Sequence, residues 1–76
     1  MNFKQCFFRI YDKKIASGEV SFSRTGITKD QFTALCTEPD FVFDQELLNK
    51  LKVTMNLTDE QHDALVRAAA GEDVQL

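Results

Sequence analysis

The sequence predicts an all-α protein in which five short helices form one compact bundle. Three observations support this prediction. Apolar residues recur at spacings of three and four, three helix starts carry capping signals, and the hairpin dipeptides Asn-Gly, Asp-Gly and Gly-Gly do not occur. A chain of 76 residues has room for one domain only. We expect that domain at residues 1–76, with its core at about 3–71 and a C-terminal tail at 72–76.

The first helix is predicted to run from Asn2 to about Lys14. Asn2 can cap it, because its side chain can accept a hydrogen bond from a free backbone amide of the first turn. Spacings of three and four place four residues on one apolar stripe: Phe3, Phe7, Ile10 and Tyr11.

The segment between Ser17 and Thr25 gives two conflicting signals. Val20 and Phe22 alternate with polar residues, which taken alone indicates a short strand. The position of the segment between two helices, with Gly26 after it as a closing residue, favours a short second helix.

The third helix is predicted to begin at Thr28. Thr28 can form a capping box with Gln31, and Ile27 and Phe32 occupy the positions of a hydrophobic staple. The helical spacing turns three residues toward the core: Phe32, Leu35 and Cys36. It turns three polar residues outward: Lys29, Asp30 and Thr33.

The fourth helix is predicted from Gln45 to about Met55. Asp44 can cap it, and Phe43 and Leu48 are placed to form a second staple. Its buried stripe consists of Leu47, Leu48, Leu51 and Met55.

The fifth helix begins after Thr58, which can form a capping box with Gln61. Asp59 and Glu60 lie in its first turn, where the positive end of the helix dipole favours acidic residues. Leu65 and the alanines supply the apolar face, and Gly71 can take the left-handed closing conformation.

The remaining composition disfavours several other classes of protein. Cys6 and Cys36 lack the paired spacing of a zinc site, so we expect two buried thiols and no metal. His62 is the single histidine, and no nucleophile stands at a spacing from it that is typical of a catalytic motif. We therefore expect that the protein is not an enzyme and has no catalytic residue, cofactor or small-molecule substrate. No apolar run approaches the roughly 20 residues of a membrane helix. The N-terminal residues also lack the apolar region of a signal peptide. These features fit a cytoplasmic protein of bacterial type without a membrane partner.

The charge is unevenly divided along the chain. Residues 1–29 hold six bases and two acids, a formal charge of +4, whereas residues 30–76 hold three bases and ten acids, a formal charge of −7. The basic part can face phosphates while the acidic part faces solvent, although both can equally be ordinary solvated surface.

Two short helices joined at Gly26-Ile27-Thr28 are what a helix-turn-helix requires. The "GIT" at this turn, the apolar Phe32 and Leu35, and the segment "FDQELLNKLKVTMNLTDEQHDALVRAAAG" resemble the lambda-repressor-like (Xre or Cro) family, and most closely its small regulators of firmicute type. The resemblance covers about residues 3 to 71. It departs at the second helix, where Phe22 falls at a position that is usually small, so either that helix is shifted by one residue or its turn packs differently.

The resemblance implies a small transcriptional regulator that binds duplex DNA with the third helix in the major groove. It implies base contacts from Thr28, Lys29, Asp30 and Thr33, and phosphate contacts from Lys13, Lys14, Ser17 and Arg24. It also allows a homodimer that reads two half-sites. The alternative is a protein-interaction module, such as an antitoxin-like or phage-related adaptor, that keeps the fold without binding DNA; the acidic second half and Phe22 fit this alternative.

Overall fold

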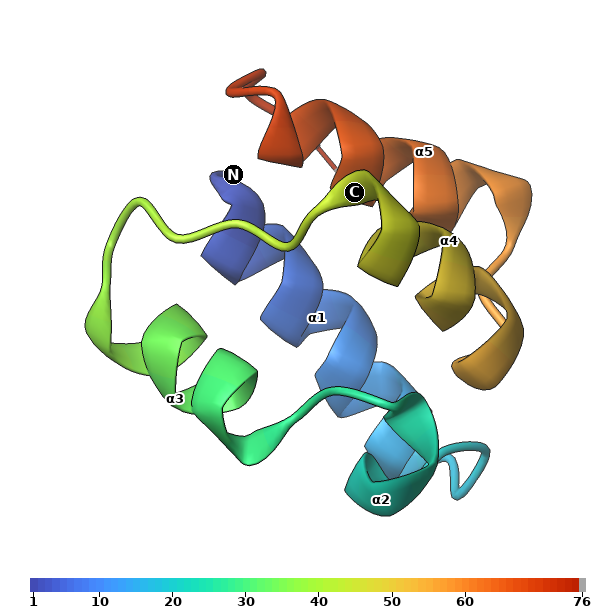
Figure 1. The fold of residues 1–76 in the computed structure, drawn as a ribbon. Helices are drawn as coiled ribbons and strands as arrows, with labels where there is room; N and C mark the ends of the chain where they lie inside the picture. The colour runs from blue at the N-terminus through green and yellow to red at the C-terminus, as the bar shows by residue number, and fades with distance from the viewer. Residues whose placement is uncertain (76) are drawn as a thin grey trace.

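The computed structural model describes residues 1–75 and contains five helices and no strand within that range (Figure 1). The helices are α1 (Phe3–Ala16), α2 (Phe22–Thr25), α3 (Lys29–Thr37), α4 (Gln45–Thr54) and α5 (Asp59–Ala69). The all-α class and the order of the elements are therefore confirmed. Helix α1 runs through the middle of the molecule, with α5 on one side of it and α3 on the other (Figure 1).

The predicted capping signals start four of the helices. Asn2, Thr28 and Thr58 each form a complete capping box, in which the cap side chain and the glutamine three residues later exchange hydrogen bonds with each other's backbone amides. At α4 the Asp44 carboxylate accepts a hydrogen bond from the Leu47 amide at 2.8 Å. These local bonds satisfy amides that no helix can satisfy internally.

Helix α2 is a single turn, shorter than the segment predicted for it. Its N-cap, Ser21, makes no side-chain capping bond, and Gly26 ends it in the left-handed conformation with φ of 83°. Serine and glycine between residues 17 and 23 supply neither helix propensity nor apolar contacts, which explains the short length. The turn is fixed instead by the buried Thr25, whose hydroxyl donates to the Phe22 carbonyl at 2.7 Å and accepts from the Ile27 amide at 3.1 Å.

The core lies between α1, α4 and α5. The Phe43 ring makes edge-to-face contacts with the rings of Phe3 and Phe7, at centroid distances of 5.4 and 5.3 Å. The predicted stripe of α4 is confirmed, because all four of its residues are buried. The fully buried side chains with the largest volume are Phe7, Ile10, Leu35, Leu48, Leu51, Met55 and Leu65.

Helix α3 is attached to this core mainly through Leu35, which is completely buried. Phe32 is only partly buried, in contrast to the prediction that it is a core residue. Its ring lies 5.7 Å from Phe8, 5.9 Å from Tyr11 and 5.1 Å from Phe22, measured between centroids. These four rings form an aromatic cluster that fills the space between α1, α2 and α3.

The two cysteines differ, so the prediction of two buried thiols is wrong for Cys36. Cys6 is completely buried, and this burial raises the pKa of its thiol. Cys36 is exposed, because it follows the buried Leu35 by one residue and so points about 100° around the helix from it.

The C-terminal segment is part of the packed structure, although the sequence placed the core at 3–71. Val74 is buried, and its backbone amide donates to the Met1 carbonyl at 3.3 Å. The Met1 ammonium in turn donates to the Val74 carbonyl at 2.8 Å and pairs with Asp73. This contact joins the two ends of the described chain, and no signal in a short window of sequence predicts it.

Candidate nucleic-acid interface

Three of the four predicted base-contacting residues share the outer surface of α3. Lys29, Asp30 and Thr33 are all exposed. They point away from Leu35, which anchors the opposite side of the helix to the core. The surface therefore presents a cation, a carboxylate and a hydroxyl within about one turn of helix.

Thr28 is exposed but has a different place. Its hydroxyl oxygen accepts the Gln31 amide hydrogen at 3.1 Å as the N-cap of α3. Together with Gln31 it lines a hollow between α3 and α4, at the edge of the surface that carries the other three residues. Its capping role is thus established, while its hydroxyl hydrogen is left to donate elsewhere.

The outer surface of α3 also extends further than the sequence analysis proposed. Cys36 and Thr37 are exposed and continue the line of Lys29 and Thr33 along the helix. The Thr37 hydroxyl donates to the Thr33 carbonyl at 2.9 Å. The helical period alone places both residues outward.

The four predicted phosphate-contacting residues do not form one surface. Arg24 is exposed in α2, two residues before Gly26, and lines a hollow with Gly18 and Glu19. Lys13 is exposed on α1, but it lies roughly 140–160° around that helix from Phe8 and Tyr11, the residues that face α3. The Ser17 hydroxyl donates its hydrogen to the Lys14 carbonyl at 3.0 Å. Of the four predicted residues, only Arg24 both lies just before the turn into α3 and forms no ion pair with any residue in the range 1–75.

Lys14 is buried, with 9% of the residue exposed, and its ammonium is used inside the protein. It donates to the Asn56 carbonyl at 2.9 Å and pairs with the Glu19 carboxylate at 3.1 Å. Lys14 therefore does not offer its charge to a phosphate in this structure, in contrast to the prediction. The sequence held the signal for its burial, because Lys14 follows Ile10 by four residues and Phe7 by seven, and so lies on the same stripe.

Replacing Lys14 with methionine is expected to lower the free energy of unfolding by about 1–3 kcal/mol, because the Asn56 carbonyl loses its donor in a part-buried hydrogen bond while the packing of the aliphatic stem is kept. Lys13→Met is the matched control, and its exposed site predicts a change within about 0.5 kcal/mol. Thermal and urea unfolding followed by circular dichroism measure both. Equal melting of the two variants would contradict a structural role for Lys14.

The same variant should change the response to acid. The hydrogen bond from Lys14 lowers the pKa of Glu19 below its ordinary value of 4.5. A carboxyl with a lowered pKa in the folded state contributes stability above that ordinary value, and the contribution is lost as the pH falls through the folded-state pKa. Lys14→Met should therefore make the loss of stability below about pH 4.5 shallower.

Lys50 of α4 is the residue that the sequence analysis missed. An ideal Cβ on Gly26 would lie 2.7 Å from Lys50 Cε and 2.8 Å from Lys50 Nζ, so the lysine side chain lies directly over the turn between α2 and α3. It is exposed and lines the same hollow as Thr28. No pattern within α4 indicates this contact, because it joins residues 24 positions apart.

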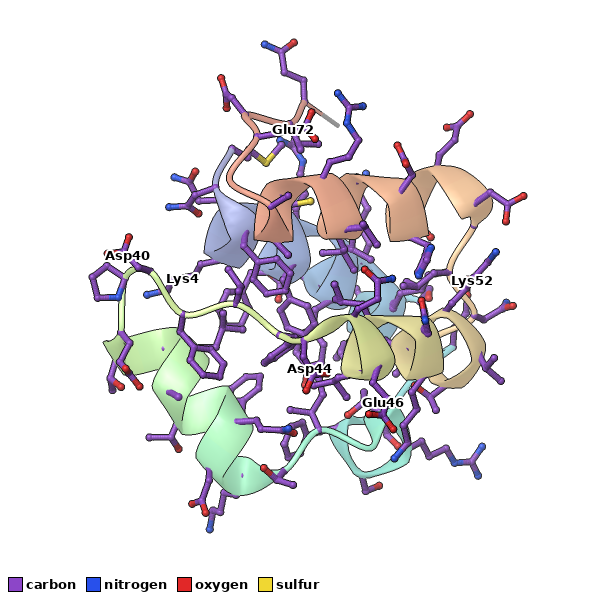
Figure 2. The ribbon with its side chains drawn as sticks, turned by 45° about the horizontal axis from the view of Figure 1, so that its top comes forward. Lys4, Asp40, Asp44, Glu46, Lys52 and Glu72 are labelled. Atoms are coloured by element: carbon purple, nitrogen blue, oxygen red, sulfur yellow. The ribbon has the colours of Figure 1, made fainter. Side chains whose placement is uncertain are left out.

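Asp44 and Glu46 line that hollow as well. Figure 2 shows both on the side of α4 that faces the turn before α3. Asp44 is engaged as the cap of α4, whereas Glu46 forms no ion pair with any residue in the range 1–75. The cations at this turn therefore have acidic neighbours, which weaken the positive potential there.

Three of the ten acids in residues 30–76 form ion pairs with bases of the same half. Lys52 pairs with Asp59 at 2.6 Å, and Arg67 lies 3.7 Å from Asp63 and 3.2 Å from Glu72. Arg24, Lys29 and Lys50 form no ion pair with any other described residue. The basic side chains near α3 are thus free to meet an external anion.

Other kinds of site have little support in residues 1–75. No group of three or more potential metal-binding side chains comes together in that range. The half-buried His62 imidazole of α5 lies 3.1 Å from the Asn49 amide oxygen of α4. None of the helices among these residues has the length and apolar character needed to cross a bilayer.

Comparison with known proteins adds no assignment. The chain matches no protein-family model, no curated protein and no solved structure.

Proposed function

We propose that this protein binds duplex DNA through the outer surface of α3 and acts as a small transcriptional regulator. The observation that carries the proposal is the exposed surface of Lys29, Asp30 and Thr33, which follows a turn preceded by Arg24, an exposed cation that forms no ion pair with residues 1–75. A helix that enters the major groove needs short polar side chains on its outer surface and cations at its flanks.

Each residue of this surface has a defined chemistry toward base edges. The Lys29 ammonium can donate to the O6 and N7 acceptors of guanine, and the Asp30 carboxylate can accept from the amino group of cytosine. Thr33 can contact a thymine methyl group or make one hydrogen bond. The Arg24 guanidinium, which is planar and always charged, suits a phosphate and positions the protein without reading sequence.

The formal charge of −3 does not prevent this mode of binding. Helix α5 and the C-terminal segment, which carry Asp59, Glu60, Asp63, Glu72 and Asp73, lie on the far side of α1 from α3 (Figure 1). The molecule measures 28 × 26 × 22 Å, and charges are largely screened beyond about 10 Å at 0.1 M salt. DNA at α3 is therefore affected chiefly by the charges near the turn.

A regulator of this size also needs more contacts than one protomer offers. A homodimer doubles the phosphate contacts and reads two half-sites about one helical turn apart, which raises both affinity and specificity. We therefore propose that two copies of the protein pair when they bind DNA.

The second candidate function is a protein-interaction module. The specific observation in its favour is the aromatic cluster, because Phe8, Tyr11, Phe22 and Phe32 are all only partly buried. Aromatic side chains with an exposed edge are common at protein interfaces. The acids Asp44 and Glu46 beside the turn fit this candidate better than they fit DNA.

Selection from a random pool of labelled duplexes at low salt separates the two functions. DNA binding predicts that one sequence family is enriched over successive rounds, with symmetric half-sites if a dimer binds. An unchanged pool after selection, together with a partner protein recovered by pull-down, would favour the interaction module.

A further inference from the structure

We propose that Lys50 is a further phosphate-contacting residue, which reaches the DNA backbone from α4 beside the turn between α2 and α3. This inference rests on the proposed function. It adds a residue from the acidic half of the chain, which neither the charge distribution nor the resemblance to a known family assigns.

The first support is the position of the ammonium. Lys50 Nζ lies over Gly26, so close that a Cβ on that residue would be 2.8 Å from it. Gly26 thus serves the turn in two ways, since it adopts φ of 83° and leaves room for the lysine. The ammonium is held next to the start of α3, where the proposed interface begins.

The second support is the absence of an internal partner. Lys52, two residues further along α4, pairs with Asp59 at 2.6 Å. Lys50 forms no ion pair with any residue between 1 and 75, although Glu46 precedes it by one helical turn. An exposed cation without a partner retains its full charge for an external anion.

The third support is the grouping of cations. Arg24 comes from α2, Lys29 from α3 and Lys50 from α4, and all three flank the single turn at Gly26. The three cations border this turn from different sides, because Arg24 lines a separate hollow with Gly18 and Glu19. A DNA phosphate that meets the start of α3 can be contacted by Lys50 while Lys29 reaches toward the bases.

Glu46 has the opposite effect on the same phosphate. It lines the hollow that holds Lys50, and it lies on the side of α4 that faces the turn (Figure 2). Its carboxylate repels a phosphate at that position and lowers the affinity that Lys50 would otherwise give. Neutralising Glu46 should therefore strengthen binding, whereas neutralising Lys50 should weaken it.

The test compares Lys50→Ala with Lys52→Ala, which removes the same charge from the same helix. Fluorescence anisotropy with a labelled random-sequence duplex gives the affinity of each variant between about 50 and 200 mM salt. The salt slope is the slope of the logarithm of the affinity plotted against the logarithm of the salt concentration. We expect Lys50→Ala to make this slope shallower by about one unit. Between about 50 and 200 mM salt the variant should therefore lose roughly three- to fourfold less affinity than the wild type. Lys52→Ala should keep the wild-type slope.

Two further variants complete the test. Lys50→Arg should restore the slope, and Glu46→Gln should bind more tightly than the wild type at every salt concentration. If the wild type binds and Lys50→Ala retains its slope, Lys50 makes no contact and only this inference fails. If the wild type binds no duplex at low salt, the proposed function fails and this inference fails with it.

Discussion

Replacing Leu35 with alanine should lower the free energy of unfolding by about 2–5 kcal/mol. Leu35 is completely buried and is the one buried residue of α3, so the truncation leaves a cavity where α3 joins the core. In a domain of this size each kcal/mol shifts the melting temperature by about 4–8 °C. Thermal unfolding followed by far-UV circular dichroism measures the loss.

Two variants of the same helix serve as controls. Thr33→Ala lies on the outer surface and should change the stability by less than about 0.5 kcal/mol. Phe32→Ala should cost about 2 kcal/mol, less than a fully buried phenylalanine, because its ring is only partly buried in the aromatic cluster. Wild-type melting of Leu35→Ala combined with loss of stability in Thr33→Ala would mean that α3 is rotated and that its outer surface is wrongly assigned.

Replacing Arg24 and Lys29 with alanine should have the largest effect on DNA binding. Arg24→Ala should weaken binding to all sequences alike and reduce the salt slope by about one unit, since it removes a phosphate contact. Lys29→Ala should relax the preference at one base position, where a good base contact is worth about 1–3 kcal/mol. Binding curves on a selected duplex and on its single-base variants separate these two effects.

Lys13→Ala is the matched control for charge. It removes one exposed cation, but from the part of α1 that faces away from α3. It should leave both the slope and the sequence preference unchanged. A loss of affinity in Lys13→Ala equal to that in Lys29→Ala would show that net charge, and not the surface of α3, governs binding.

Most helix starts could be predicted from the sequence because their causes are local. A capping box such as that of Thr28 and Gln31 spans four residues, and its hydrogen bonds form whenever the helix forms. The stripe of α4 is equally local, since helical spacing alone brings its leucines together. The conformation of the turn after α2 could not be predicted in this way, because the Thr54 hydroxyl, 29 residues further along the chain, donates to the Thr25 carbonyl at its end.

The candidate site could be predicted only in part, because some of its residues are placed by local helical spacing and others by contacts between distant segments. The helical period places Lys29 and Thr33 on the outside of α3 without knowledge of the rest of the fold. Lys14 and Lys50 look alike in a charge count, yet one is buried against Asn56 and the other lies over Gly26. The helical stripe of Phe7 and Ile10 indicates the burial of Lys14, whereas only the packing of distant segments places Lys50 over Gly26.

The most direct test of DNA binding by α3 is the affinity of the wild-type protein for duplex DNA at two salt concentrations, measured by fluorescence anisotropy. Phosphate contacts from Arg24 and Lys50 predict binding at low salt that weakens with a slope of about −2 for each protomer as salt rises. Absence of affinity for any duplex pool at low salt would contradict DNA binding and leave α3 as a structural helix only.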